Sequence, residues 1–258
     1  MKNHIVMKVI VLPDIHGRKF WSSALKHIDE CERVVFLGDY FDPYNFEGIS
    51  VADAIDNFGE ILSFVKDYPA KVVMLLGNHD LPYFSEDYRS LARGHCRWSR
   101  EWHTVIADKF DANRDLFSLA HVEDHILFTH AGCSMRWLSI IDAHAATLSE
   151  LVAMLNALLS TKDGLRQLFM ASRYRGGWDE AGSCVWADVH ELVHASDDLR
   201  IGAGPVVKQV FGHSLQVKRD QSGKVVSGDP ITTSTMKMLD NRCAYLLDTE
   251  SFTHEALL

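Results

Sequence analysis

The sequence predicts an α/β fold, because apolar strands alternate with helices along its first third and further strands close the chain. Three β-branched, apolar runs are separated by segments whose apolar residues recur at helical spacing. In chain order these are a strand at 5–12, a helix at 18–29, a strand at 33–37, a helix at 51–66 and a strand at 71–76. This βαβα order with a strand-rich end predicts one α/β sandwich.

We expect the end of the chain to form a closing antiparallel series of strands. Short β-prone runs occupy residues 224–226, 235–239 and 244–247. Turn-forming pairs, Ser222-Gly223 and Asp240-Asn241, precede the first and the third of these runs.

Helices are expected to interrupt the sandwich in the middle of the chain. Residues 134–190 are rich in helix formers, with a marked apolar helix at 148–159, and lie between expected strands at 125–129 and 206–211. Residues 81–120 show no clear period. A length of 258 residues can still be one large α/β domain. We therefore expect a single domain over residues 1–258, with 134–190 as a helical insertion or cap.

Composition and charge indicate which partners and which cellular compartment to expect for this chain. The chain is 47% hydrophobic with a net charge of −9, which argues against stable binding to nucleic acid or to an anionic membrane. No apolar run approaches the roughly 20 residues of a membrane-spanning helix, so no membrane partner is expected. The five cysteines form no Cys-x-x-Cys pair and suit reduced thiols, and no cleavage site follows the first apolar run. These features predict a cytoplasmic protein.

The expected strands end in residues that can bind metal ions. These are Asp14, His16, Asp39, Asp42, Asn78, His79, His130 and His213. A single Gly-Asp after a strand is ordinary turn chemistry, but five strand ends of this kind are hard to explain by structure alone. All the ligand atoms are oxygen or nitrogen, which suits Mn²⁺, Fe²⁺ or Zn²⁺. Two such ions about 3.5–4 Å apart can activate a hydroxide and clamp the oxygens of a phosphate ester.

The order of these residues resembles the calcineurin-like metallophosphoesterase superfamily. The motifs are Asp14-x-His16, Gly38-Asp39-x-x-Asp42, Gly77-Asn78-His79-Asp80, His130 and Gly212-His213. Any one of them is a weak signal, whereas five in this order are specific. The resemblance implies a four-layer α/β/β/α sandwich with the helical insertion. It also implies two divalent metal ions as cofactors, Mn²⁺ first, with Fe²⁺ or Zn²⁺ as alternatives.

The resemblance also implies a role for each residue. The six metal ligands would be Asp14 and His16 on the first ion, Asn78, His130 and His213 on the second, and Asp39 bridging both. His79 would be the general acid that faces the leaving-group oxygen, and Asp42 would orient it. Independently of the resemblance, a histidine acting near neutral pH needs one ring nitrogen held by a carboxylate.

Two departures place the chain within the superfamily. Many nuclease members carry a second histidine after Gly-His, where this chain has Leu215, which is similar to the protein-phosphatase-like branch of phage and bacterial type. That branch usually has a phosphate-gripping arginine directly after the second aspartate of Gly-Asp-x-x-Asp, where this chain has Pro43. Arg175 and Arg173, in a loop with two glycines, are candidate replacements, since a guanidinium fork matches phosphate oxygens. The alternative is that this loop is basic and solvated and makes no contact with phosphate.

The expected function is a dinuclear metal-dependent phosphoesterase that uses a metal-activated hydroxide on phosphomonoesters or phosphoproteins. A dinucleoside polyphosphate hydrolase and a phosphodiesterase or nuclease stay open, so the substrate partner is a phosphorylated small molecule, a nucleotide or a phosphoprotein. A non-catalytic interaction module on the same fold is the alternative from another class. A zinc-protease pattern, residues 190–194, also occurs, but its flanking run is short and a complete metal set exists elsewhere.

Overall fold

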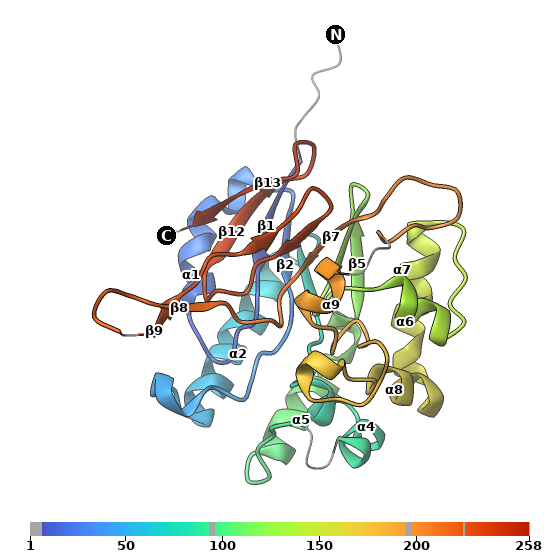
Figure 1. The fold of residues 1–258 in the computed structure, drawn as a ribbon. Helices are drawn as coiled ribbons and strands as arrows, with labels where there is room; N and C mark the ends of the chain where they lie inside the picture. Colours follow the sequence, from blue (N-terminus) through green and yellow to red (C-terminus); the bar gives the residue numbers. More distant parts are fainter. Residues whose placement is uncertain (1–6, 93–95, 195–197, 224, 258) are drawn as a thin grey trace.

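Two β-sheets pack face to face at the centre of the protein, with helices on both outer faces (Figure 1). The computed structural model describes residues 7–92, 96–194, 198–223 and 225–257. The first sheet has the order β13 (Thr253–Leu257), β12 (Ala244–Asp248), β1 (Lys8–Leu12), β2 (Arg33–Phe36), β3 (Val72–Leu75), β4 (Phe117–Ser118). The second has the order β10 (Ile231–Thr232), β11 (Met236–Met238), β7 (Lys208–Phe211), β6 (Ile126–Thr129), β5 (Ala120–Glu123).

The helices lie between the strands, and the first two follow β1 and β2 as the predicted alternation requires. They are α1 (Phe20–Ala24), α2 (Val51–Asp67), α3 (Leu81–Phe84), α4 (Glu86–Leu91), α5 (His103–Asp111), α6 (Met135–Ile140), α7 (Leu148–Ala157), α8 (Lys162–Leu168) and α9 (Val189–His194). Short 3₁₀ turns cover Leu25–Glu30, Asn45–Glu47, Arg114–Leu116, Leu158–Ser160 and Arg173–Arg175. Among the helices so described, none is long and apolar enough to cross a membrane.

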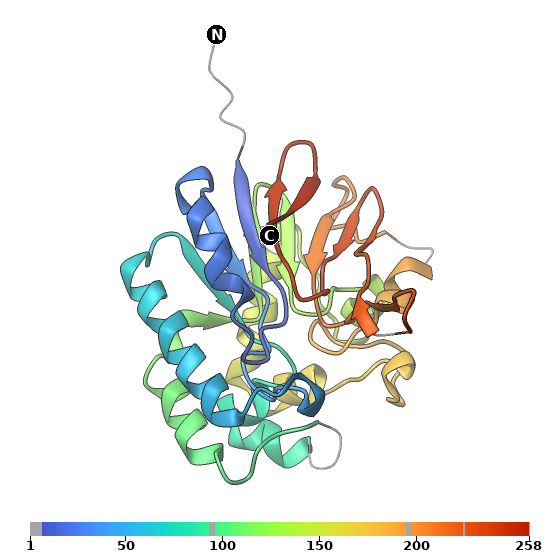
Figure 2. The ribbon, with the colours of Figure 1, turned by 90° about the vertical axis from the view of Figure 1, so that its left-hand side faces the viewer.

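The alternation of side chains along β1 explains the layers. Val9 and Val11 point into the core between the two sheets, where they meet β6 and β7. Ile10 and Leu12 point to the other face and pack in the core that contains the buried side of α2. Figure 2 shows the blue helices α1 and α2 on one side of the strands and orange segments on the other. The expected α/β sandwich of four layers, helices, sheet, sheet and helices, is confirmed.

Local sequence accounts for the start of α2. The Ser50 hydroxyl accepts a hydrogen bond from the Asp53 backbone N–H at 3.1 Å, and the Asp53 carboxylate accepts one from the Ser50 N–H at 3.0 Å. This capping box satisfies two backbone donors that a helix start leaves free. The helix expected at 18–29 is instead α1 followed by a 3₁₀ turn.

The expected antiparallel series at the end of the chain is wrong. Strand β9 (Val225–Ser227) pairs only with β8 (Val217–Arg219) in a separate hairpin, within the described part of the chain. Strand β11 runs parallel to β7 in the second sheet, and β12 lies antiparallel to β1 in the first. The turn at Asp240-Asn241 therefore carries the chain from one sheet to the other. Each of these strands is short, so packing onto a sheet face decides its partner rather than adjacency in sequence.

The expected helical insertion lies in the crossover between the parallel strands β6 and β7. Trp137, Leu151 and Leu165 from this stretch share one hydrophobic core with Ile10 of the first sheet and Phe58 of α2. Helix α9 covers the outer face of the second sheet, where its apolar side packs. Residues 81–120, which show no period in the sequence, hold α3, α4, α5 and the strand β4 that leads from the first sheet to the second.

Candidate metal and phosphate site

Five strand ends meet at one edge of the sandwich. Strands β1, β2 and β3 run parallel in the first sheet, and β6 and β7 run parallel in the second, so the loops after them open onto the same face. Four residues of these loops adopt left-handed backbone conformations: His16, Asp39, Asp42 and His213, with φ between 43° and 67°. Such conformations are costly for residues other than glycine and concentrate at functional sites.

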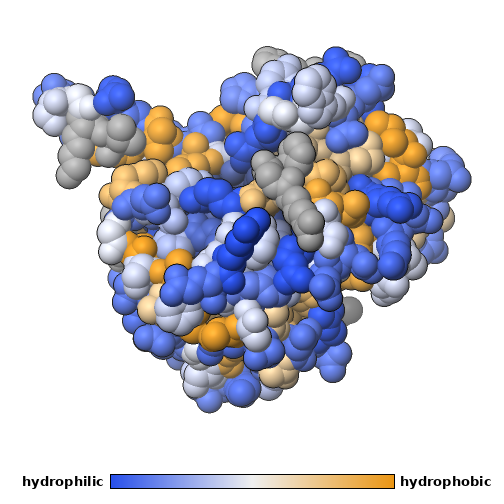
Figure 3. All heavy atoms as spheres, turned by 90° about the horizontal axis from the view of Figure 1, so that it is seen from below, coloured by the Kyte–Doolittle hydropathy of each residue, from blue (hydrophilic) through white to orange (hydrophobic). Residues whose placement is uncertain are grey.

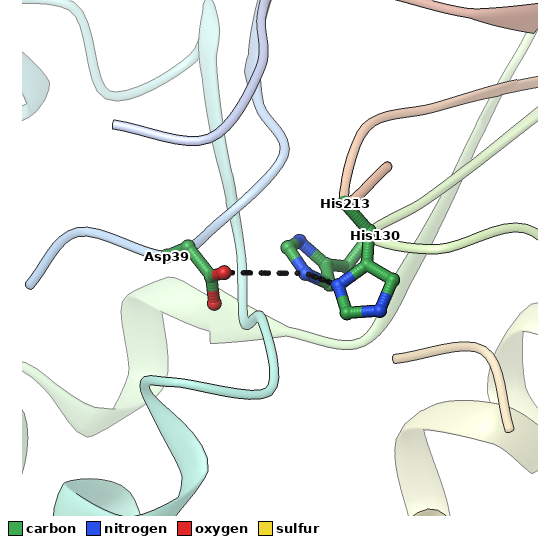
Figure 4. A group of neighbouring side chains, drawn as sticks. All are labelled: Asp39, His130 and His213. Carbon is green, nitrogen blue, oxygen red and sulfur yellow. Dashed lines mark hydrogen bonds and ion pairs between the residues drawn. The ribbon is translucent and has the colours of Figure 1, made fainter. Parts of the chain in front are cut away.

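One group of ligand atoms forms around Asp39, His130 and His213 (Figure 4). The Asp39 carboxylate lies 3.5 Å from His130 Nε2, and His213 Nδ1 lies 3.0 Å from the same atom. The amide oxygen of Asn78 is also 3.0 Å from His130 Nε2. All four residues are buried, so the structure brings together the residues expected to hold the second metal and the expected bridge.

A second group contains Asp14, His16 and Asp39, again buried. His16 Nε2 lies 3.4 Å from an Asp39 oxygen. Asp39 therefore belongs to both groups, as a bridging ligand must. Burial alone would raise the pKa of Asp39, but the neighbouring imidazoles, His130 foremost, lower it to about 2, so the carboxylate is ionised.

Backbone carbonyls orient two of the imidazoles. His16 Nδ1 donates to the carbonyl of Phe41 at 2.7 Å, and His130 Nδ1 donates to that of Leu37 at 2.8 Å. Each Nε2 faces the cluster, and an imidazole held by a backbone carbonyl at its other nitrogen is the arrangement of a metal-binding histidine. Burial lowers the pKa of His16 to about 3, so its imidazole is neutral at neutral pH.

The residues present fit metal ions. Four potential ligand atoms converge, because an Asn78 oxygen, an Asp39 oxygen and His213 Nδ1 lie 3.0, 3.5 and 3.0 Å from His130 Nε2. A further buried carboxyl group, Asp240, has an Oδ1 atom without a hydrogen-bond partner among the described residues, and burial together with the charge of Asp14 raises its pKa well above 3.8. The oxygen and nitrogen donors suit hard or borderline divalent ions.

Glycines and a buried aspartate hold these ligands in place. A Cβ atom on Gly77 would meet Asp39 Oδ1 at 2.1 Å, and one on Gly212 would meet Asp14 Oδ1 at 2.4 Å. Asp80 accepts backbone hydrogen bonds from Asp39, Tyr40 and Gly77 at 2.7, 2.9 and 2.8 Å. Asp80 thereby ties two of the strand-end loops together. Its place in the Gly77-Asn78-His79-Asp80 motif gives no sign of this role.

His79 and Asp42 form a pair beside the two groups. His79 Nδ1 lies 3.1 Å from Asp42 Oδ2, and the other Asp42 oxygen accepts from the Tyr83 hydroxyl at 2.6 Å. Burial lowers the pKa of His79, but its interactions with Cys96 and Asp39 and its bond to Asp42 outweigh burial and leave this pKa well above 6.5. A protonated imidazole with one nitrogen fixed by a carboxylate can act as a general acid.

An open cavity of about 410 Å³ lies next to the group around His130, since Asn78 and His213 line it. It is lined by Tyr44, Asn78, His79, Cys96, Arg97, Tyr174, Arg175, Trp186 and His213. Arg175, a predicted substrate contact, lines it, whereas Arg173 is exposed and is not among the lining residues. Seen from below, the face onto which the strand ends open carries many hydrophilic side chains, drawn in blue (Figure 3).

Five lining residues are not among the site residues predicted from the sequence: Tyr44, Cys96, Arg97, Tyr174 and Trp186. Arg97 lies within the stretch 81–120, which has no clear period, so nothing in the sequence connects it to the strand ends. Tyr44 lies two residues after Asp42, and this proximity to a motif was the one available signal.

The zinc-protease pattern at 190–194 lies on α9. The Glu191 carboxylate accepts from the Gly182 backbone N–H at 3.2 Å, and His190 lies 2.8 Å from Asp188. The side chain of His194 lies outside the described residues. No metal-binding group in the described ranges includes His190 or Glu191.

Comparison with known proteins agrees with this geometry. The calcineurin-like phosphoesterase family model matches residues 7–214, which include all five strand-end motifs. No curated protein matches the chain. The family supports metal-dependent hydrolysis of phosphoesters in general and divalent metal ions at the strand ends. On this match over most of its length, the chain belongs to the calcineurin-like phosphoesterase family.

Proposed function

We propose that this chain is a dinuclear metal-dependent phosphatase that hydrolyses phosphomonoesters, including phosphoproteins, and belongs to the protein-phosphatase-like branch. One observation carries the proposal: two buried ligand groups share Asp39, and His79, paired with Asp42, lines the cavity beside them. Asp14 and His16 would hold one ion and Asn78, His130 and His213 the other. The bound ions, Mn²⁺ in our proposal with Fe²⁺ or Zn²⁺ as alternatives, would supply an activated water and a clamp for phosphate oxygens.

The proton needed by the leaving group would come from His79. Its Nδ1 lies 3.1 Å from Asp42 and 3.2 Å from the backbone carbonyl of Arg97, which leaves Nε2 for the substrate oxygen. Because His79 is 12% exposed and lines the cavity, a leaving group that enters from solvent can reach it.

Arg175 is proposed as a contact for the substrate phosphate. Its Nε donates to His213 Nε2 at 2.9 Å, and it lies 3.6 Å from Asp188. If His213 ligates through Nδ1, its proton sits on Nε2, so Arg175 Nε must leave that atom and becomes available in the cavity, while Nη2 donates to the His213 carbonyl. We propose a phosphate contact for Arg173 as well, supported only by its position in the same loop as Arg175.

A nucleotide-type anhydride is the second candidate substrate. Three aromatic side chains, Tyr44, Tyr174 and Trp186, line the same cavity, and aromatic rings can stack on a base. We further propose a single domain over residues 1–258, supported by the hydrophobic core that the 134–190 region shares with α2. A cytoplasmic location is proposed because all five cysteines are free thiols.

Metal analysis and a substrate panel test the proposal. Wild-type protein should bind two Mn²⁺ ions per chain and hydrolyse an aryl phosphomonoester faster than an aryl phosphodiester. Asp39→Asn should lose both ions' high-affinity binding, whereas the control Asp142→Asn, whose carboxylate is 89% exposed, should retain it. Phosphopeptides and dinucleoside polyphosphates in the panel separate the two candidate substrates. A chain that binds no metal and stays inert with added Mn²⁺ would refute the function.

A further inference from the structure

We propose that Arg97 binds the substrate phosphate and supplies the guanidinium group that is missing at Pro43. The inference rests on the proposed function, because it concerns the ligand of the same cavity. Arg97 lines that cavity together with His79 and Asn78, although it lies 54 residues beyond Pro43 in the chain.

The backbone around Arg97 is fixed to the proposed general acid. The carbonyl of Arg97 lies 3.2 Å from His79 Nδ1. Two residues on, the Ser99 N–H donates to the Tyr83 hydroxyl at 2.6 Å, and that hydroxyl donates to Asp42 at 2.6 Å. The carboxylate that orients His79 therefore also anchors the segment that carries Arg97. The positions of His79 and Arg97 relative to the cavity are therefore coupled.

The side chain of Arg97 rests on an aromatic ring that follows Pro43. Its guanidinium carbon lies 4.2 Å from the centroid of the Tyr44 ring. A cation–π contact uses the flat face of the guanidinium and leaves the N–H groups along its edge free to donate. The loop after Asp42 therefore does not carry a phosphate-binding arginine itself. It supplies the Tyr44 ring on which Arg97 rests.

Arg97 has fewer polar partners than Arg175, the other arginine that lines the cavity. Within the described ranges, its guanidinium forms no ion pair and no hydrogen bond, and the residue is exposed. Arg175, by contrast, is bonded to His213 and lies near Asp188. An unpaired guanidinium beside buried carboxylates and imidazoles matches an anion with several oxygens, since two parallel N–H groups can bind two phosphate oxygens.

Inorganic phosphate is the probe that tests this role. We expect calorimetry on Mn²⁺-loaded protein to show phosphate binding that weakens at least about 10-fold in Arg97→Met, with unchanged Mn²⁺ stoichiometry. The value of kcat/KM for an aryl phosphomonoester should fall about 10- to 100-fold in the same variant. Arg97→Lys keeps the charge without the fork and should recover part of the loss.

Arg100→Met is the matched control. Arg100 lies in the same segment, also against an aromatic ring, with its guanidinium carbon 5.9 Å from the Trp98 ring centroid, but it does not line the cavity. Its phosphate affinity should stay within about twofold of wild type. Equal phosphate affinity in wild type and Arg97→Met would overturn the inference, as would wild-type protein that does not bind phosphate. An active wild type with an equally active Arg97→Met would refute Arg97 alone, whereas a metal-loaded wild type without phosphatase activity would refute the proposed function.

Discussion

Replacing Gly77 by alanine tests how closely the fold positions the proposed bridging ligand. The added Cβ would lie 2.1 Å from Asp39 Oδ1, about 1.3 Å short of ordinary van der Waals contact at 3.4 Å. It would also lie 2.8 Å from the Asp39 backbone nitrogen, so the side chain cannot escape the clash by rotating alone. Because Gly77 does not have a positive φ, the effect of the substitution is steric.

The expected displacement of Asp39, about 1 Å, gives the size of the effect. Overpacking of this kind typically costs about 1–3 kcal/mol of folding free energy. Misplacing a catalytic group by about 1 Å can cost on the order of 10²-fold in rate. Asp39 Oδ1 also accepts the His79 backbone N–H at 2.9 Å, so this hydrogen bond should be lost with the movement.

The assay compares Gly77→Ala with Gly59→Ala. Mn²⁺ affinity measured by calorimetry should fall at least about 10-fold in Gly77→Ala, and kcat/KM about 100-fold. Gly59 lies inside α2, and apart from its chain neighbours and the backbone of its own helix no atom lies within 4 Å of an added Cβ. Gly59→Ala should therefore keep metal binding and gain about 0.5–1 kcal/mol of stability. Wild-type metal affinity in a folded Gly77→Ala protein would refute the reasoning about Asp39.

Three further substitutions test other parts of the site. His79→Asn should retain both metal ions but lose about 10²–10⁴-fold in kcat, and unchanged turnover would remove His79 from the mechanism. Asp80→Asn leaves one oxygen for three backbone donors and should lower the free energy of unfolding by about 1–3 kcal/mol in urea titrations; equal midpoints would contradict this. His16 has a folded pKa of about 3 against 6.5 unfolded, so only the unfolded state gains a proton as pH falls below 6.5. Between pH 7 and pH 5, the free energy of unfolding of chelator-treated wild type should therefore fall by about 2 kcal/mol more than that of chelator-treated His16→Asn. An equal fall in both proteins would contradict this prediction.

The sequence determined the strands and the ligand types. Buried strands such as β1 and β2 appear in it as apolar, β-branched runs, and each strand leads directly into the residues at its end. Asp14, Asp39 and Asn78 could therefore be assigned to one edge of a sheet from local pattern alone. The capping residues Ser50 and Asp53 likewise act locally, so the start of α2 at Val51 was predicted at the observed residue.

Only the tertiary structure decided which segments meet. Arg97 reaches the cavity because its segment contacts His79 and Tyr83, which lie on the other side of a stretch without periodicity. The strands β11 and β12 are separated by a short turn, which predicts a hairpin, yet they join different sheets. The buried acceptor role of Asp80 similarly depends on two loops lying side by side.

The physical reason is the range of the interactions. Strand and helix preferences and caps depend on a few neighbouring residues, so the motif Gly38-Asp39-x-x-Asp42 is recognisable in the chain itself. The partners of a side chain depend on packing between residues far apart in sequence. The ligand set was thus visible in the sequence, whereas the cavity, its second arginine and the left-handed turns that aim Asp39 and Asp42 depend on how the two sheets pack together.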